Sequence, residues 1–147
     1  MDILCLSHLR WDFVFQRPQH LLSRAAKQGR VFYVEEPVFD GGSRVELGTR
    51  DNGVRIVVPH LPSDSDRNGS IAMLRRMLSR LVDETRLTDF VLWLYTPMAL
   101  PAATHLAPAA VVYDCMDELS RAAGVVPARG GTLRSRRSRV HGWTGAV

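Results

Sequence analysis

This sequence of 147 residues is poor in cysteine and in metal-binding patterns. Its two cysteines, Cys5 and Cys115, each lie in a short apolar run, where a free thiol behaves as a small buried hydrophobe. No Cys or His spacing typical of a zinc site is present, so we expect no metal centre. Without a disulfide framework, the sequence favours a reduced, cytoplasmic protein.

Long apolar runs are also missing. No stretch approaches the roughly 18 apolar residues that a membrane-spanning helix needs, and the N-terminus lacks the basic region and cleavage site of a secretory signal. The chain is 46% apolar and 23% charged, which is typical of a globular protein. These features predict a cytoplasmic domain whose contact with a membrane is at most peripheral.

Glycine is absent between Ser7 and Gln28, in the place that a nucleotide-binding turn would occupy. Neither the G-x-G-x-x-G dinucleotide turn nor a P-loop can therefore form after the first predicted strand. The G-x-S-x-G elbow of serine hydrolases is missing as well. Dehydrogenases and NTPases of these classes lose their main sequence support.

Acidic residues are absent from residues 128–147, which hold five arginines, whereas the whole chain carries a net charge of +4. Outside this segment, 14 basic residues face 15 acidic ones, so no basic surface can be inferred for the rest of the chain. Arginines among glycines, without interleaved aromatic residues, are a weak signal for nucleic acid. We expect no nucleic-acid partner; a salt-sensitive affinity that is lost on deleting residues 128–147 would contradict this.

Apolar runs typical of buried strands alternate with helical patterns along the chain. Pro18 fits the first position of a helix that ends near Gly29, and Ser70 is expected to cap a second helix with an apolar face. A short helix or turn is expected before His105. This alternation predicts an α/β fold with a Rossmann-like, doubly wound parallel sheet. The predicted strands are residues 2–7, 30–36, 54–58, 89–95 and 110–113.

In an open parallel sheet, ligands bind beyond the carboxyl ends of the strands. The predicted order therefore brings together the loops at residues 8–17, 95–98 and 114–120. Hydrogen-bond donors near a helix N-terminus suit an anionic or heavily hydroxylated ligand. The binding candidates in and after the first loop are Arg10, Trp11, Arg17, Gln19 and His20.

A structural role is the alternative for this first loop. In that interpretation Trp11, Phe13 and Phe15 fasten the loop to the core, and Arg17 pairs with a neighbouring carboxylate. The residue types alone support both interpretations equally.

The third loop carries an acidic cluster of Asp114, Asp117 and Glu118. A carboxylate at a strand end could accept a hydroxyl proton or bind sugar hydroxyls, although Asp117 could equally cap a following helix. His60 follows Pro59 and is expected to be a turn residue.

Five segments carry a resemblance to a known family. The chain resembles the N-terminal half of bacterial glycosyltransferases of the GT-B class, a class that includes the retaining glycosyl transferase group 1 enzymes. The resemblance covers roughly residues 2–120, and its first and last segments are the most specific. The segments are SHLRWDFVFQRPQHLLSR, VFYVEEPVFD, VRIVVPHLP, LWLYTPMALP and VVYDCMDELS.

The resemblance implies two Rossmann-like domains that face each other across a cleft. The C-terminal domain would bind a nucleotide-sugar, which is a co-substrate rather than a resident cofactor, and the N-terminal domain would shape the acceptor side. Transfer in such enzymes is typically metal-independent. Asp117 and His20 are weak candidates for a catalytic role. The positions that would line this half of the cleft are Arg10, Trp11, Arg17, Gln19, His20, Tyr95, Thr96, Asp114, Asp117 and Glu118.

The sequence departs from the family pattern after the last of these segments. We expect residues 1–123 to form an incomplete acceptor-side domain and residues 124–147 to be a disordered Arg/Gly-rich tail. Reread from the second base of each codon, the tail permits an amphipathic helix, an apolar strand and a glycine turn, so we interpret it as out of frame. Sequencing the gene tests this interpretation, because an open second-domain frame must then follow.

Two functions therefore remain open at the level of sequence. The first is a glycosyltransferase fragment for a glycan or lipid-linked acceptor, inactive without its donor-binding domain. The second is a non-enzymatic, flavodoxin-like module that binds a small anion or a sugar.

Overall fold

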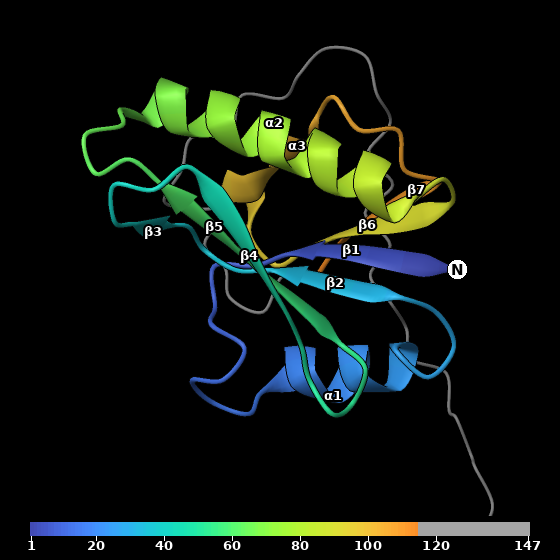
Figure 1. Ribbon diagram of the computed structural model, residues 1–147. Coiled ribbons are helices and arrows are strands. Elements are labelled where there is room, and N and C mark those ends of the chain that lie inside the picture. Colours follow the sequence, from blue (N-terminus) through green and yellow to red (C-terminus); the bar gives the residue numbers. More distant parts are fainter. Residues whose placement is uncertain (115–147) are drawn as a thin grey trace, which may run out of the picture.

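The computed structural model describes residues 1–114, which form a single α/β sheet structure (Figure 1). The predicted Rossmann-like parallel sheet is confirmed, with the strand order β3-β5-β2-β1-β6-β7 and with β4 antiparallel to β5. The strands are β1 (Asp2–Leu6), β2 (Val31–Val34), β3 (Val38–Phe39), β4 (Arg44–Thr49), β5 (Arg55–Leu61), β6 (Phe90–Leu94) and β7 (Ala110–Tyr113). The helices are α1 (Arg17–Ala25), α2 (Arg67–Thr85), the 3-10 turn η1 (Pro97–Ala99) and α3 (Leu100–Ala103).

The helices cover the two faces of the sheet separately. In Figure 1, α1 lies on one side of the sheet and α2 lies on the other, where it packs against α3. Side chains alternate between the faces along each strand. On β1, Leu4 packs toward the α2 layer, whereas Cys5 packs toward α1.

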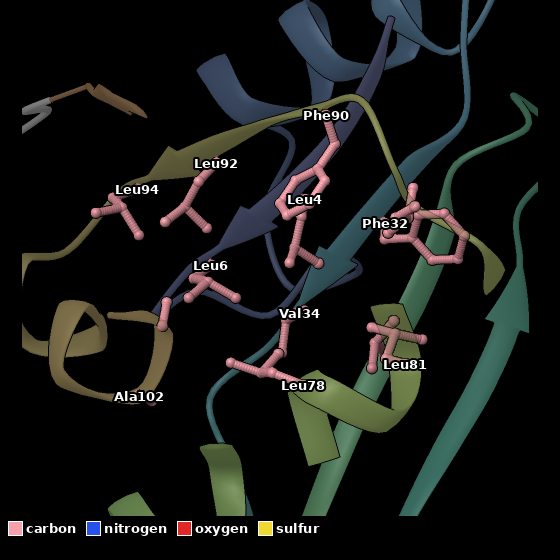
Figure 2. Close-up of a cluster of buried hydrophobic side chains, with 13 residues drawn as sticks. Leu4, Leu6, Phe32, Val34, Leu78, Leu81, Phe90, Leu92, Leu94 and Ala102 are labelled. Carbon is pink, nitrogen blue, oxygen red and sulfur yellow. The ribbon is translucent and has the colours of Figure 1, made fainter. Parts of the chain in front are cut away.

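The core on the α2 side contains a large cluster of buried aliphatic and aromatic side chains (Figure 2). Leu4 and Leu92 are partners in the register of β1 and β6, and both are at most 2% exposed. Leu78 and Leu81 of α2 pack on the strand side chains and cover this core. Burial of such side chains contributes about 1.5–3 kcal/mol each, so this face holds α2 firmly on the sheet.

The core on the α1 side mixes aromatic, aliphatic and polar groups. Trp11 and Tyr33 pack edge to face, with ring centroids 4.9 Å apart. Leu22 of α1 is 1% exposed and contacts the same cluster. The helix begins at Arg17, one residue earlier than predicted, with Pro18 in its first turn, and it ends at Ala25.

Helix α2 begins earlier than predicted. Asp66, rather than Ser70, is its N-cap, since the Asp66 carboxylate accepts a hydrogen bond of 2.7 Å from the Gly69 backbone. Residues 67–69, which were expected to be loop, and Ser70, which was expected to be the cap, therefore belong to the helix. Ser70 lies inside the first turn, where its backbone N–H already donates to Asp66 O.

The segment around Pro59 is a strand rather than the turn that was expected. Proline lacks an N–H and disrupts a central strand unless no donor is needed at its position. On the edge of β5 that faces β2 and β3, Glu35 N donates to Val57 O and Asp40 N donates to Leu61 O. Pro59 lies between these contacts, where β2 has ended and β3 has not begun, so no ladder hydrogen bond is lost.

The prediction that His60 is a turn residue is wrong. His60 is a buried residue of β5 whose Nδ1 lies 2.7 Å from Asp40 Oδ2 and whose Nε2 lies 3.3 Å from Glu46 Oε2. Hydrogen bonds from Arg44 and His60 hold the pKa of Asp40 well below its ordinary value. The imidazole thus joins the loop after β3 to the hairpin strand β4, which the sequence did not predict.

Within residues 1–114, β7 pairs with β6 alone. Val111 faces the α2 side with its register partner Leu92 and is 52% exposed. Several predictions fall outside the described residues: the site candidates Asp117 and Glu118, the thiol Cys115, the incomplete domain end at residue 123 and the tail at residues 124–147.

Candidate functional site

The carboxyl ends of β1, β2 and β6 meet at one edge of the sheet, as expected from the topology. Ser7 N donates to Val34 O and Tyr95 N donates to Leu6 O, each at 3.0 Å, so the parallel register continues just past the strands. Asp114 N donates to Leu94 O in the same way. The starts of the three predicted loops therefore lie side by side.

Glu35 organises this edge from the end of β2. Its carboxylate is 7% exposed and accepts two hydrogen bonds from the loop after β1, one from Trp11 N at 2.8 Å and one from Arg10 Nη1 at 3.0 Å. A buried carboxylate is tolerated when it is paired and hydrogen-bonded in this way. Arg10 is thus paired within the domain, and its side chain stays 41% exposed.

Gln19 holds the far part of the same loop. Its amide nitrogen donates to Trp11 O at 2.6 Å and to Val14 O at 2.9 Å, and its amide oxygen accepts from Gln16 N at 2.9 Å. The side chain is 3% exposed. Both amide hydrogens are therefore committed to the loop, and the structure gives Gln19 a positioning role.

The aromatic residues of the loop divide into one that is buried and two that are not. Trp11 is 6% exposed, whereas Phe13 is 84% exposed and Phe15 is 68% exposed. Phe15 contacts the ring of the exposed His20, with centroids 4.5 Å apart. The alternative that all three aromatic residues fasten the loop is right for Trp11 and wrong for the two phenylalanines.

Arg17 pairs with a carboxylate, as the structural alternative for the loop predicted. Its Nε lies 3.2 Å from Asp114 Oδ2, which joins the start of α1 to the end of β7. The buried Cys5 thiol lies near this pair, and burial together with the Asp114 charge raises its pKa well above the ordinary value. A thiol in such surroundings stays protonated and unreactive.

Tyr95 belongs to the same α1-side layer. Its ring is buried 6.2 Å from that of Trp93, and burial raises the pKa of its hydroxyl. The Tyr95 hydroxyl and the Trp93 indole N–H are buried without a hydrogen-bond partner among the described residues. Neither group titrates in the physiological range, so neither is suited to act as a base.

On the α2 side of the same edge lies a cavity of about 310 Å³. It opens where β1, β2 and β6 end, and α2 and α3 form its walls. Thr96 is the one predicted site residue among its lining residues, and its Oγ1 accepts from Met98 N at 3.3 Å. The lining comprises Leu6, Ser7, His8, Val34, Glu35, Glu36, Pro37, Ile71, Leu74, Leu78, Thr96, Met98, Ala99 and Ala102.

The sequence-predicted residues are thus split between two places. Thr96 lines the cavity, while the other described candidates belong to the first loop, to α1 or to the α1-side layer. His8 was overlooked although it directly follows Ser7, and its Nδ1 is buried without a hydrogen-bond partner within residues 1–114. Glu35 and Glu36 were overlooked too, although two acidic residues after a fully apolar strand are the same kind of signal as Asp114.

No cluster of residues that could hold a metal ion occurs in the described part of the chain. No helix there is long and apolar enough to span a membrane. The site as built can bind through hydrogen bonds from His8, through the exposed Glu36 carboxylate and through apolar contact.

Comparison with known proteins yields one structural similarity. No family model matches the sequence, and no curated protein matches it. A solved structure from E. coli, described as trehalose-6-phosphate bound with UDP-2-fluoro glucose, matches with a TM-score of 0.47 and 12% sequence identity. The match covers 72% of this chain and 30% of that chain. The chain thus corresponds to less than a third of that structure.

Proposed function

We propose that this chain is the acceptor-side part of a GT-B glycosyltransferase, which transfers a sugar from a nucleotide-sugar to a glycan or lipid-linked acceptor. The observation that carries the proposal is the cavity of about 310 Å³ at the carboxyl ends of β1, β2 and β6. This is the edge at which open α/β sheets bind their ligands. Each of the first four family-like segments contributes to this edge or to the strands that lead to it.

The polar groups at the mouth of the cavity suit an acceptor with hydroxyl groups. The exposed Glu36 carboxylate can accept hydrogen bonds from sugar hydroxyls. The imidazole of His8 lines the cavity and can donate or accept a hydrogen bond, according to its tautomer. Glu35 is already paired with Arg10 and Trp11, so it supports the mouth without contacting a ligand directly.

The donor nucleotide-sugar would bind to a second domain, and no metal or resident cofactor is required in this proposal. The described half holds no acid–base pair that could complete the transfer by itself. We therefore expect the 147-residue chain to bind an acceptor and to show no transfer.

The test measures saccharide binding to the 147-residue chain by ligand-detected NMR, with His8→Ala and Glu36→Gln as site variants. We expect each variant to weaken binding about tenfold, which corresponds to the loss of one useful hydrogen bond of about 1.4 kcal/mol. His105→Ala is the matched control, because His105 is exposed, contacts Ser79 of α2 and does not line the cavity. Equal affinities of all four proteins would refute the proposed site.

A second assay supplies radiolabelled nucleotide-sugars and candidate acceptors to the same chain. Detectable transfer would show that the chain holds a complete active site and would overturn the assignment of half a site.

The alternative of a small-anion module finds no support in the geometry, because Arg10 and Arg17 are both paired with carboxylates of the domain.

A further inference from the structure

We infer that the cavity on the α2 side binds a hydrocarbon chain, so that the acceptor is an amphipathic molecule with an apolar tail. This inference rests on the proposed function and names the class of acceptor. It is carried by the distribution of polar and apolar groups along the cavity wall.

Nine of the 14 lining residues are apolar. The strands contribute Leu6 and Val34, and Figure 2 shows both beside Leu78 and Ala102 from the helices. The remaining apolar lining residues are Pro37, Ile71, Leu74, Met98 and Ala99. Such a surface attracts a hydrocarbon by the hydrophobic effect and offers a sugar ring nothing to bond.

The polar groups near the mouth are mostly engaged already. Ser7 Oγ accepts hydrogen bonds from Leu9 N and the Tyr33 hydroxyl, and Thr96 Oγ1 accepts from Met98 N. The groups left to meet a ligand are His8 and the exposed Glu36. They mark a place for one polar head group at the opening, with the tail inside.

Small residues on η1 and α3 create the space. Ala99 and Ala102 line the cavity where a longer side chain would fill it. Pro97 and Pro101 lie in the first turns of η1 and α3. Because proline is tolerated in the first turn of a helix but breaks a helix interior, it keeps these two elements short. A water-sized group occupies about 30 Å³, so the cavity has room for about ten groups of the size of a methylene.

The experiment measures binding of n-alkyl β-D-glucosides, from hexyl to decyl, to the 147-residue chain below their micelle concentrations by titration calorimetry. A methylene transferred from water to an apolar site contributes about 0.8 kcal/mol. We therefore expect the affinity to rise about fourfold with each added methylene until the cavity is full.

Ala99→Trp fills the cavity and is expected to abolish the dependence on chain length. Ala72→Trp is the matched control, because Ala72 lies on the exposed face of α2, and it should keep the fourfold increments. If Ala99→Trp does not fold, as judged by circular dichroism, Met98→Gln replaces it, since Met98 is 55% exposed and its loss should not disturb the core. Met98→Gln should reduce the affinity for decyl glucoside severalfold.

Affinity that does not depend on chain length, or that is unchanged by the cavity variants, would overturn the inference. The head group tests the proposed function separately. Equal affinity for an alkyl glucoside and an alkyl phosphocholine of the same length would contradict a sugar acceptor and leave the hydrocarbon site standing.

Discussion

The two sides of the sheet's carboxyl edge differ in how they are closed. On the α1 side, the loop after β1 folds over the strand ends and is fastened by Glu35 and Gln19 through hydrogen bonds to its backbone. On the α2 side, the described residues leave a cavity beside the strand ends, lined by Thr96, by η1 and by the residues after β1 and β2. The difference shows that a single carboxylate and a single amide can close one side of an edge while the other side stays available for a ligand.

The largest effect should come from removing the anchor of the closed side. Trp11→Ala deletes a buried aromatic side chain that contacts Tyr33, and such truncations cost about 3–5 kcal/mol. Urea unfolding measures the change. The matched control is Phe13→Ala in the same loop, which should stay within about 0.5 kcal/mol of the parent because Phe13 is 84% exposed. Equal losses would show that the loop is not divided as described.

A smaller loss is expected when Gln19 can no longer donate. Gln19→Glu keeps the shape of the side chain and its bond from Gln16 N, but it leaves Trp11 O and Val14 O without their donor. Buried acceptors without a partner cost about 1–3 kcal/mol. Gln28→Glu, at an exposed position beyond the end of α1, is the control. Unchanged stability of Gln19→Glu would argue against a positioning role.

The open side should respond in the opposite direction. Ala99→Leu adds apolar atoms to the cavity of about 310 Å³, so we expect unfolding to need up to about 1 kcal/mol more free energy. Differential scanning calorimetry detects this as a higher Tm. A clear drop in Tm would mean that the space is too narrow to accept a side chain, and hence too narrow for a ligand.

The smallest effect concerns the amino end of β1, far from both sides of this edge. Hydrogen bonds from Arg30, the shortest at 2.6 Å, lower the pKa of Asp2 from its ordinary value of 3.8. Because the folded state binds this proton less readily than the unfolded state, the ion pair stabilises the protein above about pH 4. That contribution is lost as the pH falls through the lowered pKa. The stability difference between the parent and Asp2→Asn should therefore be full at pH 7 and shrink below pH 4 in urea titrations, and a pH-independent difference would contradict the role of the pair.

The parallel strands could be predicted because a short local run of apolar residues, such as that of β2, indicates a buried strand. Strand β4 could not, because its alternating Val45 and Leu47 are exposed and lack the apolar run of a core strand. Residues near Pro59 were misjudged because a proline is tolerated there only through the gap between β2 and β3. That gap is a property of the sheet and not of the local sequence.

The site could be predicted only in part for a similar reason. The topology correctly placed the loops after β1, β6 and β7 side by side. Cavity-lining residues such as Leu74 and Ala99 have the same apolar signal as the core, so no sequence pattern distinguishes a wall from filled space. The partners of Arg10 and Arg17 were also hidden, because Glu35 and Asp114 are distant in the chain.

The arrangement of the loop after β1 also has a consequence for protein engineering. Its anchors, Glu35 and Gln19, hold it mainly by backbone atoms, whereas the Phe13 and Phe15 side chains at its tip are largely exposed. The tip should therefore tolerate substitutions, because exchanging these two side chains leaves the hydrogen bonds of Glu35 and Gln19 in place. A library randomised at these two positions should retain mostly folded members, so that new surface specificity could be selected on an unchanged scaffold.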